Sequence, residues 1–281
     1  MYNAQNSTAS SFASANPVRE IVLGRAAVAE RAPVAISMAG AQQNEMLRAL
    51  SRSELEAMFS DLELVHLPAG KCLHDFGSKF EYTYFPTNAI VSLLYVMEDG
   101  ATTEIGVVGR EGVVGVALYE SERANCSAVV QSAGYGYRLK TSALRARFNQ
   151  GGTFAQLLMC YTSAMFAQMA QNVVGGRHST IEQKLARWLL ERLDRSLGTE
   201  LKVTQETMAS MLGVRRETIT MTAGKLQDEG LIQYRRGKVE VLDRAGLELR
   251  AGSCYKASRF GFEQMQAMAR ANGGMGGSAY Q

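Results

Sequence analysis

The sequence predicts an α+β chain in which a β-sandwich or β-barrel precedes a long helix, two short helices and a β-hairpin. Short apolar stretches punctuated by Gly, Pro and Asn run from about residue 62 to 144, which is typical of strands in compact β-structure. Glycine is then absent from Thr153 to Val174, where apolar residues recur with the three-four spacing of a helix. The length of 281 residues fits about two domains.

Composition excludes two broad classes of protein. Apolar residues make up 46% of the chain and charged residues 20%, which is ample for packed cores and excludes wholesale disorder. The 30 Lys and Arg residues nearly balance the 27 Asp and Glu residues, giving a net charge of +3. Because this charge is small, histone-like coating of nucleic acid is excluded, and any DNA binding must depend on local placement of charge.

Cysteine usage and hydropathy indicate a cytoplasmic protein with no membrane contact. The four cysteines form no CxxC pair, which fits neither a zinc finger nor a disulfide scaffold. We find no apolar run of the ~18 residues that a spanning helix needs, and the first residues lack the order of a signal peptide.

The β-rich domain is assigned to residues 41–150. It follows a tail over 1–40 that is rich in Ala, Ser, Asn and Gln and is predicted to be disordered. A short helix is predicted near Asn44–Phe59. The C-terminal extension, 251–281, ends in a Gly-rich stretch and is predicted to be partly disordered. The expected strands lie in Leu64–Gly70, Tyr82–Pro86, Ala89–Val96, Thr103–Val108, Cys126–Val130 and Gly134–Leu139.

The long helix is assigned to residues 151–176, where Gly175 and Gly176 are expected to end it. Periodicity alone leaves two interpretations of its apolar stripe open: packing against its own domain, or pairing with a second copy as a dimerisation helix. A second amphipathic helix, from Ile181 to Leu197, begins the last domain, 177–250. The stripe comprises Phe154, Leu157, Leu158, Tyr161, Ala164, Met165, Gln168 and Asn172.

Residues 202–226 have the pattern of a helix-turn-helix. Thr204 is a favourable N-cap, and Gly213 ends the first helix. A small residue at the helix crossing, Ala in this case, lets two helices approach closely at a steep angle. The inward-facing positions are Met208, Ala209, Met211 and Leu212 in the first helix and Val214, Ile219, Ala223 and Leu226 in the second.

The hairpin expected over Glu229–Leu242 resembles a wing, with a cationic turn that can reach phosphates. A structural helical hairpin with solvated charges is the alternative. Cations gathered at both the helix start and the hairpin tip favour nucleic acid. The candidate DNA-binding residues are Thr204, Gln205, Arg215, Arg216, Glu217, Thr218, Thr220, Met221, Lys225, Arg235, Arg236 and Lys238.

Taken in order, these elements resemble the Crp/Fnr superfamily of bacterial transcription regulators. The likeness covers roughly residues 45–245 and is most specific in Gly213–Ile219 and Leu226–Ile232. Weaker markers are Leu67–Gly70 and Gly109–Ala117. The resemblance implies an N-terminal β-roll (a double-stranded β-helix or jelly roll) as sensor domain, a dimerisation helix and a C-terminal winged helix-turn-helix.

The resemblance also implies a homodimer on a palindromic double-stranded DNA operator, with RNA polymerase as a candidate partner. Arg216 matches the family arginine that reads guanine, and Glu217 matches the glutamate that reads cytosine. Their chemistry agrees with these roles. Met221 stands where cyclic-AMP-responsive members carry another base-reading arginine, so the operator is expected to differ there, with Thr220 sharing the readout.

Cyclic AMP control is not expected. Family members that bind it use a glutamate for the ribose and an Arg-Ser pair for the phosphate. The matching positions have no carboxylate and a thiol in place of the arginine, so neither contact can form. We therefore expect no cofactor. The degenerate effector pocket comprises Gly115, Val116, Ala117, Cys126, Ser127, Met169 and Ala170.

Other signals are weighed against plainer roles. Arg110 or Arg123 could bind a phosphate, as of a cyclic dinucleotide, from another direction, or be solvated loop charges. Cys126 is a redox-sensitive thiol or, more simply, a small buried hydrophobe. No cysteine cluster supports an iron-sulfur site. The candidate haem ligands His66, His74 and Cys72 are more simply structural residues.

Catalytic motifs are missing: we find no P-loop, no HExxH and no nucleophile elbow, so an enzyme is not expected. Three hypotheses remain. The chain is a DNA-binding regulator that needs no effector, a regulator gated by another effector such as a cyclic dinucleotide or a redox signal, or an interaction module whose helix-turn-helix contacts protein.

Overall fold

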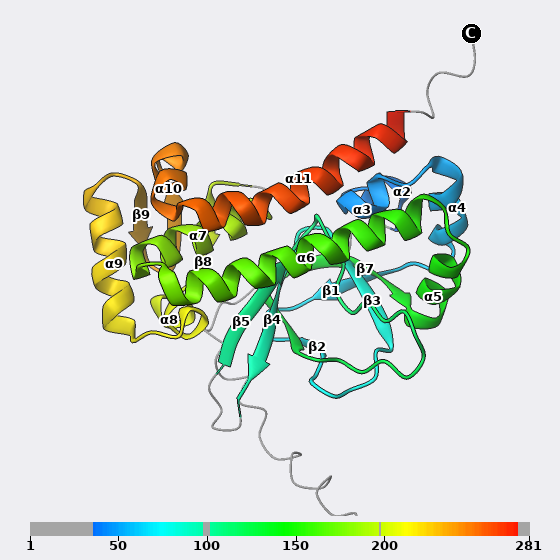
Figure 1. Cartoon of the computed structure of the whole chain (residues 1–281), viewed down its shortest axis with the longest axis horizontal. Coiled ribbons are helices and arrows are strands. Elements are labelled where there is room, and N and C mark those ends of the chain that lie inside the picture. The colour runs from blue at the N-terminus through cyan, green and yellow to red at the C-terminus, as the bar shows by residue number, and fades with distance from the viewer. Residues whose placement is uncertain (1–35, 98–101, 197, 275–281) are drawn as a thin grey trace, which may run out of the picture.

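The computed structural model describes residues 36–97, 102–196 and 198–274 (Figure 1). Most of the predicted N-terminal tail and the last seven residues of the extension lie outside these ranges. The helix expected near residues 44–59 is divided into α3 (Glu45–Arg48) and α4 (Arg52–Phe59), preceded by the short α2 (Met38–Ala41). Asn44 caps α3 by accepting from the backbone N–H groups of Met46 and Leu47, and its amide donates to Pro86 O and Gly112 O.

In the described residues, seven strands form the β-roll, in two sheets of order β1-β7-β3 and β2-β6-β4-β5, with every pairing antiparallel. All six predicted strands are present, whereas the three-residue β2 and the helix α5 (Thr141–Asn149) were not predicted. The strands are β1 (Glu63–Leu67), β2 (Cys72–His74), β3 (Tyr82–Pro86), β4 (Ile90–Val96), β5 (Thr102–Val108), β6 (Ser127–Ser132) and β7 (Gly134–Lys140).

The long helix α6 spans Gly152–His178 and crosses from the β-roll to the C-terminal domain (Figure 1). The prediction that Gly175 and Gly176 end it is wrong, because the helix continues through both. Gly175 has a packing role instead: a Cβ there would collide with the guanidinium of Arg187, which donates to Gln171 O at 3.0 Å. The absence of a side chain at Gly175 therefore lets the helix that carries Arg187 pack close to α6.

The C-terminal domain is built from α7 (Ile181–Leu193), α8 (Gln205–Leu212), α9 (Arg216–Asp228), α10 (Arg244–Ala251) and a three-stranded sheet. The sheet has the order β8-β10-β9, formed by Glu200–Lys202, Lys238–Val241 and Ile232–Arg235 respectively. Helix α7 ends at Leu193, four residues before the predicted end. The core of this domain includes Leu94 and Val129 of the β-roll, so the two domains share apolar packing.

The extension forms a helix that the sequence analysis did not predict. Helix α11 (Ser253–Gly274) runs back along α6 in the opposite direction (Figure 1). Phe262 and Met265 belong to the core of the β-roll, and Tyr255 belongs to that of the C-terminal domain. Close approach is possible because Gly261 faces Ala164 of α6. The helix therefore fastens the two domains together.

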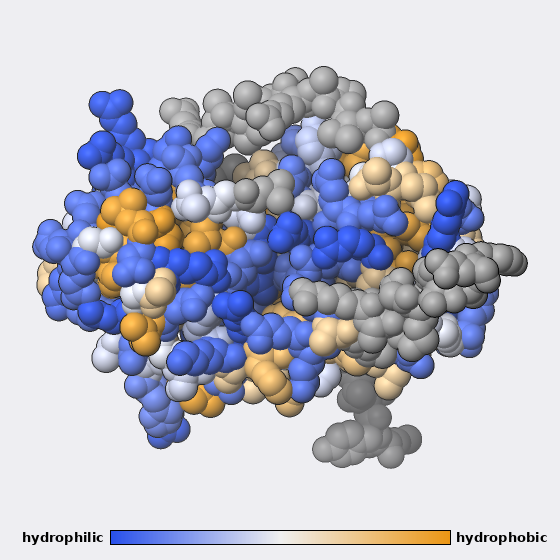
Figure 2. All heavy atoms as spheres, turned by 90° about the horizontal axis from the view of Figure 1, so that it is seen from above, coloured by the Kyte–Doolittle hydropathy of each residue, from blue (hydrophilic) through white to orange (hydrophobic). Residues whose placement is uncertain are grey.

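Hydrophilic residues cross the middle of the face seen from above, with hydrophobic patches on both sides (Figure 2). Within the described ranges no helix is long and apolar enough to span a bilayer.

Candidate nucleic-acid interface

The helix pair α8 and α9 has the geometry expected of a helix-turn-helix. Thr204 caps α8 by accepting from the N–H of Thr207 at 3.1 Å, and Gly213 ends it in the left-handed region, with φ 65°. The turn is closed by a hydrogen bond of 3.0 Å from Val214 N to Ala209 O. Of the predicted inward positions, Met208, Ala209, Met211, Ile219, Ala223 and Leu226 are buried, whereas Leu212 and Val214 are half-buried.

The outer face of α9 carries the side chains that were predicted to read bases. Arg216, Glu217 and Thr220 are exposed, and Met221 is 69% exposed. The Thr220 hydroxyl lies 2.9 Å from Gln205 Oε1, which holds the α8 side chain against α9.

The start of α9 is open to an anion. Arg215 is the N-cap residue and makes no side-chain capping hydrogen bond, so its side chain does not occupy the free backbone N–H groups of the first turn. Such a terminus, flanked by exposed Arg215 and Arg216, favours a phosphate. Thr218, which is half-buried, lies in the same turn.

Lys225, near the end of α9, has a different environment. Its ammonium lies 2.9 Å from Glu182 Oε1 of α7, and Glu182 also pairs with Arg250 at 2.8 Å. The hydrogen bond from Lys225, followed by that from Arg250, lowers the pKa of the Glu182 carboxyl. Lys225 therefore helps to fasten α9 to α7, and its predicted DNA contact would compete with this ion pair.

The wing is a hairpin with a two-residue turn at Arg236 and Gly237. Arg235 and Lys238 are the last paired residues, and the turn residues have φ of 48° and 78°. These values fit a type I′ turn, which favours Asn or Gly at its first position. Arg236 is the single non-glycine residue with positive φ in the described ranges. A charged side chain is thus held at the wing tip against the local preference of the backbone.

In the predicted effector pocket, a carboxylate lies beside the serine that was expected to face a phosphate. The Ser127 hydroxyl, which matches a phosphate ligand of the family, donates a short hydrogen bond to Asp75 and lies 3.2 Å from the N–H of Phe76. No helix follows Gly115 over residues 116–120, where the family has one. Ala117 is buried and Val116 half-buried.

The long helix contacts β5 through Met165 and Gln168, two residues of the predicted dimer stripe. Gln168 accepts from Val107 N at 3.2 Å, and the Met165 methyl group lies against Gly106. Of the two helix residues assigned to the pocket, Ala170 is exposed and Met169 is half-buried.

The residues proposed as metal or redox sites are in unreactive surroundings. Burial raises the pKa of the Cys72 and Cys126 thiols to about 11, which keeps them protonated at neutral pH. Burial also lowers the pKa of His74 to about 4, and its ring packs edge-on against Phe80. In the described part of the chain, no three His, Cys, Asp or Glu side chains converge to hold a metal ion.

The predicted dimer stripe of α6 requires correction. Seven of its eight residues are buried inside the single chain, where they pack against the β-roll and α11. The eighth, Asn172, donates to Ile105 O at 3.0 Å. The apolar residues that α6 leaves in solvent are Met159, Phe166 and Val173, which are 63%, 76% and 75% exposed, and the less exposed Val174. The seven buried residues are Phe154, Leu157, Leu158, Tyr161, Ala164, Met165 and Gln168.

Comparison with known proteins identifies the class. Residues 183–250 match the model of the Crp-like helix-turn-helix domain. A curated relative, the transcriptional regulator SdrP of Thermus thermophilus, is 35% identical over 74 residues, which cover 24% of this chain and 37% of that protein. The expected resemblance to the Crp/Fnr superfamily is therefore confirmed by sequence in the C-terminal domain.

Solved structures show a similar fold over 68% to 75% of this chain. A putative Crp/Fnr regulator from Eubacterium rectale superposes with a TM-score of 0.58 at 18% identity, covering 75% of this chain and 100% of that one. FixK2 from Bradyrhizobium japonicum gives a TM-score of 0.60 at 16% identity, covering 68% and 98%. The chain thus has a Crp-like helix-turn-helix domain joined to the β-sheet domain of the Crp/Fnr fold.

Proposed function

We propose that this protein is a transcription regulator that binds a palindromic DNA operator as a homodimer, without control by cyclic AMP. The observation that carries the proposal is the exposed start of α9, where Arg215, Arg216 and Glu217 surround uncapped backbone N–H groups. Arginine can donate twice to guanine, and a carboxylate can accept from cytosine. Phosphate contacts from the wing would fix the register of the helix in the major groove.

The exposed apolar stripe of α6 supports the homodimer. Met159, Phe166 and Val173 recur every seven residues, which places them on one line of a helix that can pair with a second copy. Exposed side chains of this size on a helix face are typical of an interface. Pairing at α6 would present two copies of α9 to two successive half-sites. RNA polymerase remains a candidate partner on the resemblance alone.

Independence from cyclic AMP is supported by the bond between Ser127 and Asp75. A cyclic phosphate at this position would meet a carboxylate and lose the serine hydroxyl that holds it in the family. Like charges this close repel strongly in a partly buried site. We therefore propose that this pocket does not bind cyclic AMP.

The experiment that tests the proposal is selection of duplexes from a random pool with the full chain, without and with cyclic AMP. We expect one palindromic motif whose half-sites lie about ten base pairs apart and whose recovery is unaffected by the nucleotide. Recovery of no motif would contradict the regulator, in favour of a protein-binding module. Recovery only with cyclic AMP would contradict the loss of the ligand.

A further inference from the structure

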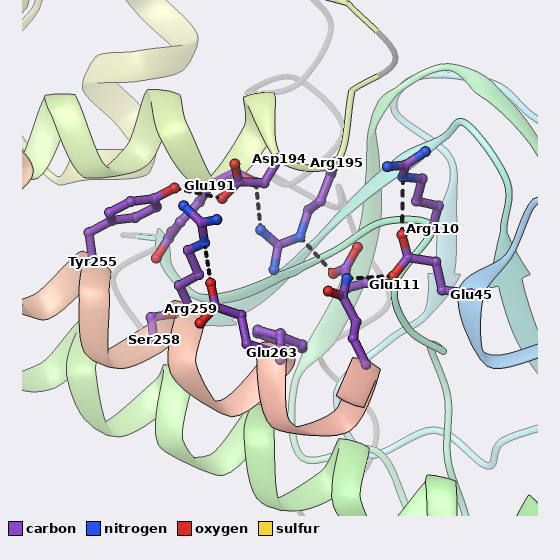
Figure 3. Close-up of a pocket in the computed structure, with 12 residues that line it drawn as sticks. Glu45, Arg110, Glu111, Glu191, Asp194, Arg195, Tyr255, Ser258, Arg259 and Glu263 are labelled. Atoms are coloured by element: carbon purple, nitrogen blue, oxygen red, sulfur yellow. Dashed lines mark hydrogen bonds and ion pairs between the residues drawn. The ribbon is translucent and has the colours of Figure 1, made fainter. Parts of the chain in front are cut away.

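A cavity of about 470 Å³ lies where the β-roll, α7 and α11 meet. Its walls are formed by Glu111 from the loop after β5, by Glu191, Asp194 and Arg195 from α7 and the turn that follows it, and by Arg259 from α11 (Figure 3). Phe262 of α11 also lines it. The volume is in the range of small-molecule sites and far exceeds that of one ion. It is separate from the degenerate effector pocket around Ser127.

The cavity is acidic, because its lining contains five carboxyl groups and three guanidinium groups. Each guanidinium faces a carboxylate of the same lining. Arg195 lies 2.7 Å from Glu111, Arg259 lies 2.6 Å from Glu263, and Arg110 lies 3.5 Å from Glu45. Of the two remaining acids, Asp194 pairs with Arg244 at 2.5 Å and accepts from the Tyr255 hydroxyl at 3.0 Å, so Glu191 is the carboxyl of the lining that has no ion pair among the described residues.

Two carboxylate oxygens at this cavity lack a donor. Within the described chain, Glu191 Oε1 and Glu111 Oε2 are buried and accept no hydrogen bond, and their residues are only 5% and 7% exposed. A buried carboxylate oxygen without a donor is costly. Burial raises the pKa of the Glu191 carboxyl in spite of the nearby guanidinium groups of Arg187 and Arg195. A donor that reached these oxygens from the cavity would supply the hydrogen bond that each of them lacks.

We propose that this cavity binds a small organic cation whose ammonium groups donate to Glu191 and Glu111. The carboxyl of Glu191, which has no ion pair among the described residues, favours a cation, and the volume favours an organic molecule. A metal ion is disfavoured because no three ligating side chains converge in the described residues. The ring of Phe262 offers an apolar wall for a short alkyl chain.

A ligand at this position would contact all three elements that set the position of the helix-turn-helix. Glu111 belongs to the β-roll and Glu191 to the first helix of the C-terminal domain, while α11 closes the cavity. A cation that bridges them would favour one arrangement of the two domains. This consequence for DNA binding rests on the proposed function, whereas the binding itself does not.

The test is calorimetric titration of the full chain with putrescine, at constant ionic strength. We expect a single-site isotherm with a Kd of about 1 mM or tighter. The diol of the same chain length lacks the charges and should give no heat of binding. Absence of a putrescine isotherm, or equal binding of the diol, would overturn the proposal, and neither result depends on a variant.

Variants locate the site. Glu191→Gln keeps the shape and removes the charge, so putrescine affinity should fall by about tenfold or more, the effect of one charge-assisted hydrogen bond. Glu120→Gln, at an exposed loop position, is the matched control and should bind as the wild type does. Equal affinity of both variants would place the site elsewhere and contradict the assignment.

The coupling is tested separately, by DNA-binding anisotropy with and without putrescine in the wild type and in Glu191→Gln. Putrescine also binds DNA, and the variant corrects for that effect. A shift in the wild type that is lost in the variant supports coupling, and equal shifts contradict it. If the chain binds putrescine but no DNA, the proposed function fails and the cation site stands.

Discussion

Glu111 and Arg195 form an ion pair across the boundary between the β-roll and the C-terminal domain, with 2.7 Å between Oε1 and Nε. The Glu111 oxygen also accepts from Gly109 N at 3.1 Å, and both side chains are almost fully buried. A second buried pair, between Glu104 and Arg192, joins β5 to α7. The two buried ion pairs therefore join the β-roll to the C-terminal domain, together with the apolar packing of Leu94 and Val129.

Arg195→Met should destabilise the chain, because it leaves the Glu111 carboxylate buried without its partner. We expect a loss of about 3–5 kcal/mol in the free energy of unfolding, measured in urea. The control is Arg52→Met, which breaks an exposed pair with Glu56 and should leave the unfolding midpoint unchanged. Equal midpoints for the two variants would show that the buried pair contributes nothing.

Arg236→Asn should make the protein more stable and a weaker DNA binder. Asn adopts the left-handed conformation of the first turn position more readily than Arg, so relief of strain should add about 1 kcal/mol to the free energy of unfolding. Loss of a phosphate contact should weaken binding to all sequences and flatten its salt dependence. Unchanged salt dependence would remove Arg236 from the interface.

Phe166→Glu should dissociate the homodimer, because it places a charge in the middle of the exposed α6 stripe. Sedimentation equilibrium should give a monomer mass, with the circular dichroism spectrum retained. Leu249→Glu on α10 changes an equally exposed apolar side chain outside the stripe and is expected to remain dimeric. A dimeric Phe166→Glu would place the interface elsewhere.

His74 should make the β-roll sensitive to acid. Burial lowers its pKa to about 4, below the unfolded value of 6.5. Between these two values the unfolded chain binds a proton that the folded ring does not bind, so the free energy of unfolding decreases as the pH falls from 6.5 towards 4. In His74→Gln, the free energy of unfolding should vary less over this interval than in the wild type. The exposed His178 provides the control, and His178→Gln should keep the wild-type slope. Parallel slopes in all three proteins would contradict the buried neutral ring.

Local patterns predicted the strands and the helix-turn-helix well, because each depends on neighbouring residues. Thr204, Gly213 and the buried Ile219 behave as their local chemistry requires. Packing partners could not be predicted in this way. The stripe from Phe154 to Gln168 is apolar whether it meets a second chain or its own domain, and periodicity does not distinguish these cases.

Helix α11 was missed for a related reason. Tyr255, Ser258, Phe262 and Met265 recur with three-four spacing and are buried, which is the signal of an amphipathic helix. The Gly-rich end that follows these residues is typical of disorder, and the extension was therefore predicted to be partly disordered. The lack of an ion pair at Glu191 could not be predicted from sequence, because it depends on which carboxylates the fold pairs with arginine.

Base readout by the start of α9 is tested most directly by the binding of Arg216→Ala to the selected operator and to a scrambled duplex, measured by fluorescence anisotropy. The variant should lose about 1–3 kcal/mol on the operator, confined to one guanine in each half-site, and little on the scrambled duplex. Equal losses on both duplexes would show that Arg216 contacts only phosphate, which would contradict base readout by this arginine.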